Sequence, residues 1–197
     1  MPFNTGPGCD LGTCDAPVFP VTAAACICET AVGGISELYF VPCTETMSEA
    51  NVTDPDWWQG LITDNKLGRS GLGLGSIAAG NKTTRRKSSC KPEEITGITW
   101  NLTFQIVCVD KTSARTTSKK VNEMLNKSSK YLLLARMCDG EEEVLPVGSF
   151  AATDIDWTVP DNVDEDRVVQ IVLSWKEKQL PDTVDVPGLS AVLPKAA

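Results

Sequence analysis

The stretch Ile98–Val109, which reads ITWNLTFQIVCV, decides the fold class of this 197-residue chain. Apolar and polar residues alternate along it, and β-branched and aromatic types dominate, which is the pattern of a half-buried β-strand. Val168–Lys176 repeats the pattern, and shorter strands are expected at Ile35–Val41, Tyr131–Met137 and Glu143–Val147. A further strand is expected at Phe150–Val159. The sequence therefore predicts a mainly β fold, an antiparallel β-sandwich or barrel.

Helical periodicity is confined to short segments. Thr117–Lys130 carries Val121, Met124 and Leu125 at helical spacing, which predicts one short α-helix flanking the sheet. Before it, Thr53 or Asp54 is placed to cap a short helical turn that contains two adjacent tryptophans. Neither segment carries a residue pattern that points to chemistry.

Three zones follow from the distribution of Gly, Pro and charged residues. Residues 1–34 form an N-terminal arm rich in Cys, Gly and Pro, residues 35–180 form the β-rich domain, and residues 181–197 form an extended tail. Inside the domain, Gly68–Lys91 is dominated by Gly, Ser, Thr and basic residues, which predicts a long loop or mobile hairpin. A loop of this length inside a compact domain is more often functional than neutral.

The charge balance limits the classes of partner. A formal charge of -8 and a pI near 4.6 argue against a protein that grips phosphate backbones, because such proteins need a basic face. No apolar run approaches the 18 residues of a membrane-spanning helix, and Met1 is followed by neither the basic nor the apolar region of a signal peptide. We therefore expect a protein made in the cytoplasm, with no membrane partner.

The eight cysteines allow two interpretations. Five of them lie in the first 43 residues, but the spacings C-x4-C and C-x-C match no paired C-x2-C zinc site. Buried thiols in a reducing cell are the simpler interpretation. Disulfides formed after a particle leaves the cell remain an alternative.

Catalytic chemistry has few candidates here, because the chain contains no histidine. This excludes Ser-His-Asp and Cys-His mechanisms and the commonest zinc ligand. Asp154 and Asp156 would share one face of a strand, but such pairs arise by chance among 26 acidic residues. The glycine run Gly71-Leu-Gly73-Leu-Gly75 lacks the Gly-Lys-Ser/Thr ending of a phosphate-binding loop. We expect no catalytic residue, no cofactor and no metal.

From Ile95 onward, the order of long strand, flanking helix and further strands resembles that of bacteriophage tail tube proteins and related secretion-tube proteins. The segments that carry the resemblance are ITWNLTFQIVCVD, the helix near Val121–Lys130, LLLARMCDG and VVQIVLSWKEKQLP. The resemblance implies a non-enzymatic virion structural protein of the tail. Its subunits would form hexameric rings, stacked into a tube through which DNA passes without specific binding.

The same resemblance makes Gly68–Lys91 the loop that contacts the next ring. Its partners would be further copies of this chain and other virion proteins, and assembly would take place in the host cytoplasm. The predicted subunit-interface residues are the basic and glycine positions of this segment: Lys82, Arg85, Arg86, Lys87, Gly71, Gly73 and Gly75.

Three other functions stay open. The cysteine-rich arm departs from a minimal tube subunit and leaves room for another phage structural role, as a connector, ring or capsid-associated protein. A disulfide-bonded extracellular binding module would explain the cysteines and the strands, but it requires a leader sequence. A carboxylate-dependent enzyme would require Asp154 and Asp156 to lie in a pocket.

Overall fold

The computed structural model describes residues 34–70, 73–85, 94–108, 115–119, 122–123, 126, 130–138, 142–158 and 167–193. Residues 115–119 are helical, and the other elements are named with their bounds. They are β1 (Ile35–Pro42), α1 (Glu49–Val52), α2 (Pro55–Thr63), β2 (Gly68–Arg69), β3 (Leu74–Arg85), β4 (Glu94–Cys108), β5 (Tyr131–Met137), β6 (Glu143–Ser149), β7 (Ala151–Thr158), β8 (Arg167–Glu177), β9 (Val184–Asp185) and α4 (Leu189–Val192).

All nine strands of the described residues belong to one antiparallel sheet with the order β7-β8-β4-β3-β1-β5-β6-β9, and β2 pairs beside β1. The mainly β, antiparallel fold expected from the sequence is therefore confirmed. The path is open, so the sheet is not a closed barrel within the described chain. Strands β3 and β1 are joined by a single registered pair, Ile35 opposite Gly75, which divides the sheet into two layers.

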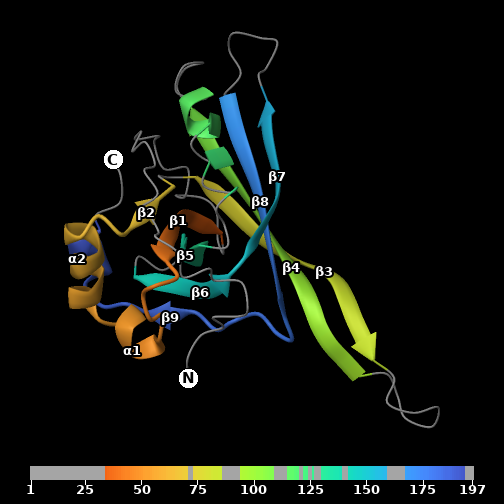
Figure 1. The fold of residues 1–197 in the computed structure, drawn as a ribbon, viewed down its shortest axis with the longest axis horizontal. Coiled ribbons are helices and arrows are strands. Elements are labelled where there is room, and N and C mark those ends of the chain that lie inside the picture. Colours follow the sequence, from red (N-terminus) through yellow and green to blue (C-terminus); the bar gives the residue numbers. More distant parts are fainter. Residues whose placement is uncertain are drawn as a thin grey trace.

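The first layer consists of β7, β8, β4 and β3, and the second consists of β1, β5, β6 and β9 (Figure 1). Alternate residues of the long strands, such as Leu102 and Phe104 of β4 and Ile171 of β8, are buried in a core between the layers. The exposed Gln105 lies between the buried neighbours of β4, as the alternation predicts.

The second layer is buried on both faces. Leu38, Phe40 and Leu133 face the core between the layers, whereas Tyr39 and Leu134 belong to a second core under the helices. Helices α1, α2 and α4 cover that side (Figure 1). Strands covered on both sides read as continuous apolar runs instead of alternating ones, which is how β1 and β5 appear in the sequence.

The prediction of one short flanking helix is wrong in number, because α1, α2 and α4 also pack on the sheet. The expected cap is confirmed: the side chain of Asp54 accepts a hydrogen bond from the backbone N–H of Asp56, and Pro55 begins α2. Trp58 is fully buried and donates its indole N–H to the carbonyl oxygen of Val52 at 2.8 Å, which ties α2 to α1.

The predicted long loop at 68–91 is also wrong for most of its described part, where β2 and the 12-residue strand β3 lie. The hairpin alternative is right, because β3 pairs with β4. The prediction was wrong because it took the glycines as a sign of a loop, whereas Gly73 and Gly75 allow close packing against another strand. A Cβ on Gly75 would lie 2.8 Å from the ring of Phe104, and one on Gly73 would lie 2.6 Å from it.

The expected extended tail differs from the structure over residues 184–193. There β9 pairs with β6, and α4 follows. Val186, Leu189 and Leu193 are buried in the second core, so the described C-terminal residues belong to the folded domain. The predicted N-terminal arm lies outside the described residues, apart from Gly34.

Candidate assembly surface

Strand register arranges the first layer into rows of residues across its two faces. On the face toward the core, the rows include Ile77–Leu102–Leu173 and Ala79–Trp100–Trp175. These apolar rows are covered by the second layer, since Leu102 and Leu173 are fully buried. This face stabilises the fold.

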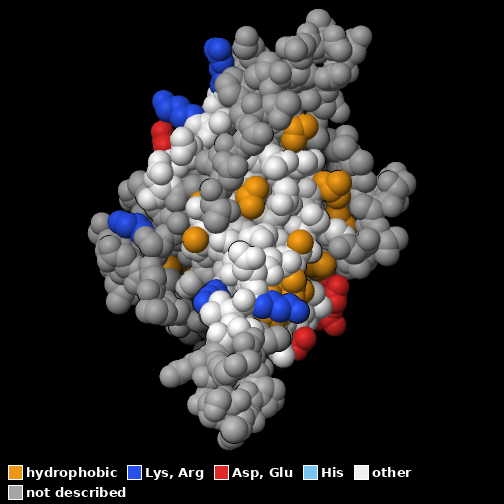
Figure 2. Space-filling model, turned by 90° about the vertical axis from the view of Figure 1, so that its right-hand side faces the viewer, with side chains coloured by type: hydrophobic (Ala, Val, Ile, Leu, Met, Phe, Trp, Pro, Cys, Tyr) orange, Lys and Arg blue, Asp and Glu red, His pale blue; other side chains and the backbone are white. Residues whose placement is uncertain are grey.

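The opposite face of the first layer is polar, and Lys176 is the only charged residue among its described side chains. Gln105 and Gln170 lie opposite each other and are joined by a 3.1 Å hydrogen bond between Nε2 and Oε1. Figure 2 shows the side of the molecule where this layer lies, with white and orange atoms over the middle of the surface and charged groups toward its margins. By register, the described side chains on this face are Leu74, Ser76, Ala78, Thr99, Asn101, Thr103, Gln105, Ala151, Val168, Gln170, Val172, Ser174 and Lys176.

Both lateral edges of the first layer are open in the part of the chain that the structure describes. Strand β7 pairs with β8 on one side, and no described strand pairs with its other side. On the far edge, β1 pairs with β3 at Gly75 alone, so β3 has no outer partner among the described strands from Ser76 onward. Open edges present rows of backbone N–H and C=O groups that another strand can pair with.

Beyond the last β4–β8 pair, Ile98 opposite Glu177, only β3 and β4 continue. Figure 1 shows this two-stranded hairpin reaching past the rest of the described chain. Register shifts interrupt β3 between Ala79 and Lys82 and again between Thr83 and Thr84. Such bulges bend and twist a ribbon.

The predicted interface residues fall into three groups: some lie on this hairpin, some pack inside the fold, and some lie outside the described residues. Lys82 is exposed on β3, and the backbone of Arg85 ends the same strand opposite Glu94. Gly73 and Gly75 lie at the other end of the segment, beneath the ring of Phe104, so they belong to internal packing. Gly71, Arg86 and Lys87 lie outside the described residues.

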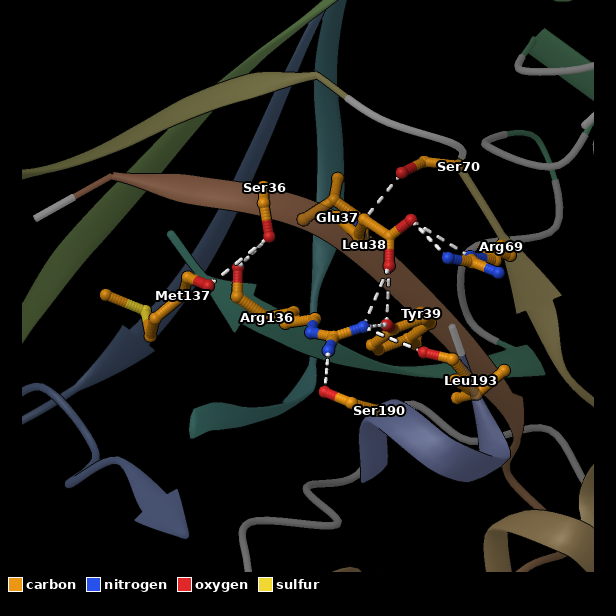
Figure 3. A network of polar contacts seen from close by, with 10 residues as sticks. All are labelled: Ser36, Glu37, Leu38, Tyr39, Arg69, Ser70, Arg136, Met137, Ser190 and Leu193. Carbon is orange, nitrogen blue, oxygen red and sulfur yellow. Dashed lines mark hydrogen bonds and ion pairs between the residues drawn. The ribbon is translucent and has the colours of Figure 1, made fainter. Parts of the chain in front are cut away.

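Sequence reasoning missed a network of buried charges in the second layer (Figure 3). Glu37 of β1 is fully buried, and its Oε1 accepts hydrogen bonds from Nε and Nη2 of Arg69 at 3.0 and 2.6 Å. Arg136 of β5 is also fully buried, with Nη1 at 3.6 Å from the Oε2 of Glu37. A charged residue inside each of the apolar runs ISELYFV and YLLLARM was the signal that could have revealed the pair.

Arg136 also holds the C-terminal helix. Its Nη1 donates to the carbonyl oxygen of Leu193 at 3.0 Å, and its Nη2 donates to Ser190 Oγ at 2.9 Å. Tyr39 donates its hydroxyl to the Oε2 of Glu37 at 2.6 Å. Burial, and then the negative charge of Glu37, raise the pKa of the Tyr39 hydroxyl well above its usual value near 10. The network is therefore a structural clasp between β1, β5 and α4.

The remaining candidates from the sequence are the carboxylate pair Asp154 and Asp156, a metal site and a membrane-spanning helix. Strand register places Asp154 opposite Val172 and Asp156 opposite Gln170. Among the described residues, no group of three His, Cys, Asp or Glu side chains gathers where it could hold a metal ion. Every helix in the described chain is too short or too polar to cross a lipid bilayer.

The described cysteines differ in state. Cys43, which follows β1, is disulfide-bonded, and its partner lies outside the described side chains. Cys138 is a buried free thiol. Of the two interpretations left open by the sequence, the disulfide therefore applies at Cys43 and the buried thiol applies at Cys138.

The sequence matches no protein-family model and no curated protein. Among solved structures, the chain is similar to one from the virion of a native gene transfer agent particle, with a TM-score of 0.30 and 13% identity over 58% of this chain and 82% of that one. It is also similar to a chain from the tail of an empty gene transfer agent particle of C6 symmetry, with a TM-score of 0.32 and 11% identity over 61% of this chain and 87% of that one.

Proposed function

We propose that this chain is a non-enzymatic virion structural subunit that assembles into rings, stacked as a tail tube through which DNA passes. The observation that carries the proposal is the first layer, a four-stranded sheet that is open at both lateral edges in the described chain. Its strands are 8, 11, 15 and 12 residues long in the order β7, β8, β4 and β3. A long sheet with two open edges favours pairing with copies of itself.

Two different edges pair head to tail, and head-to-tail contacts close into a ring when the rotation between copies allows it. Closure also removes both exposed edges, which natural sheets otherwise protect. In this arrangement, β7 of one copy pairs with the outer edge of β3 in the next copy. The ring of six and its stacking follow the resemblance of the sequence to tail tube proteins.

The two faces of the first layer determine which side lines the tube. The second layer and its helices cover the apolar face, so their bulk belongs on the outside of a closed ring. The polar face, with Asn101, Thr103 and Gln105, then lines the lumen. Apart from Lys176, the described side chains of this face carry no charge and offer phosphates no counterion, which suits DNA that must slide without binding.

The β3–β4 hairpin supplies the contact between rings. It reaches beyond the first layer, and its sequence places Lys82, Arg85, Arg86 and Lys87 in and after β3 on a chain of net charge -8. Charge complementarity with an acidic neighbour governs orientation and rate of association more than affinity. Reversing Arg85, Arg86 and Lys87 to glutamate is expected to leave the monomer folded and to block stacking. Unchanged tubes would contradict this role.

Cysteine cross-linking tests the pairing of the two edges. Leu74, Ser76 and Ala78 are exposed on β3, and Ala151 is exposed on β7. Ala78 and Ala151 lie in the same row with two strands between them, so their Cα atoms in one copy are about 14 Å apart at the usual strand spacing. A disulfide requires less than about 7 Å, so a bond between them must join two copies.

The experiment pairs Ala151→Cys with Leu74→Cys, Ser76→Cys or Ala78→Cys in one chain and oxidises each protein. A ladder of covalent oligomers from at least one pair is expected, whereas each single variant should give none above the wild-type background. If all three pairs remain monomeric while the protein assembles, the two edges do not pair.

The disulfide of Cys43 favours a second candidate, a disulfide-bonded extracellular binding module. Thiol titration of protein purified without exposure to oxidant separates the two. A reduced Cys43 in protein that still folds and assembles supports the virion subunit. A chain that folds only with the bond intact and never assembles supports the binding module.

A further inference from the structure

The apolar face of the first layer continues to both of its lateral edges. One row of paired residues crosses the whole layer on that face, Ile77–Leu102–Leu173–Ala152. Leu102 and Leu173, in the middle of the row, are fully buried. Ile77 on β3 and Ala152 on β7 also pack against the core between the layers, but both stay partly exposed. The core between the layers is therefore incompletely covered at both edges.

Ala79 extends this uncovered apolar margin along β3. It lies two residues from Ile77 on the same face of the strand, and its side chain is exposed. Strand β1 pairs with β3 at Gly75 alone, so no described strand lies beside β3 at Ile77 or Ala79. The margin of β3 therefore lacks, within the described part of one copy, the neighbouring strand that would bury it.

We propose that Ile77 and Ala79 of one copy pack against Ala152 of a second copy, so that the core between the layers continues from copy to copy. We call this side-chain contact the seam. The inference rests on the proposed function, in which β7 of one copy pairs with the outer edge of β3 in the next. The seam adds apolar burial to that pairing of backbones.

A second copy fits the margin because the two exposed ends terminate the same row. Three antiparallel pairs connect β3 to β7, so the two strands run in opposite directions and pair antiparallel in a closed ring. Opposed residues of an antiparallel pair lie on the same face of the sheet. Ile77 and Ala152 therefore meet on the apolar face. Neither side chain carries a polar atom, so the contact leaves no polar side-chain group buried without a partner.

The seam also determines which way each copy faces. Side chains alternate along a strand, so Ala78 lies on the polar face and Ala79 on the apolar one. Ala151 and Ala152 divide in the same way on β7. A slip of one residue would turn apolar side chains to the polar face, whereas registers that differ by two residues keep the seam apolar. Every copy therefore presents its polar face to the same side, as a single lumen requires.

Two adjacent alanines of β3 give a matched test. Ala78 and Ala79 are both exposed and lie on opposite faces, so glutamine at either position should leave the monomer folded, which circular dichroism checks. Ala79→Gln places an amide in the seam, and Ala78→Gln places the same amide on the polar face. Light scattering measures the concentration required for assembly, which is expected to be at least about tenfold higher for Ala79→Gln than for Ala78→Gln. Equal concentrations would overturn the proposal.

Alkylation of introduced cysteines shows directly whether the margin becomes covered. Ala79→Cys and Ala78→Cys are treated with iodoacetamide as monomer and as assembled particle, and peptide mass spectrometry measures the reaction at each position. Both thiols should react in the monomer, because both positions are exposed. On assembly, the thiol of Ala79→Cys is expected to become protected, whereas that of Ala78→Cys faces the open lumen and stays reactive. A thiol at position 79 that reacts equally fast in both states would overturn the proposal.

The proposed function and the seam fail differently. If the wild-type protein forms no assembly under any condition, both fall. If it assembles and the cysteine pairs between Ala151 and β3 form their covalent ladder while Ala79→Cys stays reactive, only the seam falls.

Discussion

The two layers of the sheet differ in how many of their faces and edges are covered or paired within this chain. The second layer is covered on both faces, by the first layer and by helices, and its buried charges are paired with each other. The first layer is covered on one face and is open at both edges in the described chain. The difference indicates that the second layer makes the larger contribution to the stability of the monomer, whereas the first layer carries the surface that we propose for contacts with other copies.

Removing the central carboxylate of the second layer should have the largest effect. Glu37→Gln leaves Arg69 and the fully buried Arg136 without their shared anion, so the free energy of unfolding is expected to fall by about 3–5 kcal/mol. Urea unfolding followed by circular dichroism measures it. Glu45→Gln is the matched control, because the Glu45–Lys66 pair lies at the surface, where solvent screening leaves an ion pair little net effect on stability. Equal losses in the two variants would show that the buried network contributes no more than a surface pair.

A substitution at the junction between the layers should have the next largest effect on the free energy of unfolding. A Cβ at Gly75 would lie 2.8 Å from Phe104 and 3.0 Å from Ile35, so Gly75→Ala is expected to cost about 1–3 kcal/mol. Gly60→Ala is the control in α2, where nothing lies within 4 Å of the new Cβ. It should stabilise the protein by about 0.5–1 kcal/mol, because alanine is the better helix former. Thermal unfolding of both variants checks the opposite signs.

Alkaline pH should weaken the clasp of the second layer. The pKa of Tyr39 is raised in the folded state, so above about pH 10 the unfolded chain releases a proton that the folded chain retains. The Tyr39 contribution is therefore fully present below pH 10 and falls by about 1.4 kcal/mol for each further pH unit, until the folded pKa is reached. Urea unfolding of wild type and Tyr39→Phe between pH 8 and 11 should show a stability difference that narrows above pH 10. A difference that stays constant would contradict the assignment.

A substitution on the polar face of the first layer should have the smallest effect on the free energy of unfolding. Gln105 is exposed and bonds only to Gln170 among the described side chains, so Gln105→Ala is expected to change monomer stability by less than about 0.5 kcal/mol. Urea unfolding measures the effect beside that of Glu37→Gln. A loss comparable to that of Glu37→Gln would remove the contrast between the two layers.

The sequence predicts the first layer better than the second. Alternation along Ile98–Val109 correctly places Leu102, Phe104 and Ile106 on a buried face, because a strand covered on one side repeats every two residues. Strand β3 was not predicted, because glycines such as Gly73 and Gly75 are typical of loops. Their close packing against Phe104 depends on a strand that is distant in the sequence. Glu37 and Arg136 are 99 residues apart by number, and no local pattern brings them together.

The proposed assembly surface was foreseen only in part. Lys82 and Arg85 do lie on the projecting hairpin, but Gly73 and Gly75 belong to packing at its base. The open edges of the first layer depend on strand order, and the burial of Glu37 beside Arg136 depends on what covers each side chain. Residue type and spacing carry neither kind of information.

Light scattering combined with negative-stain electron microscopy of the purified full chain, across protein concentration and salt, tests the central claim most directly. The account predicts rings or stacked tubes, with the proportion of tubes changing as salt screens the charges of the hairpin. A monodisperse monomer under every condition would contradict it.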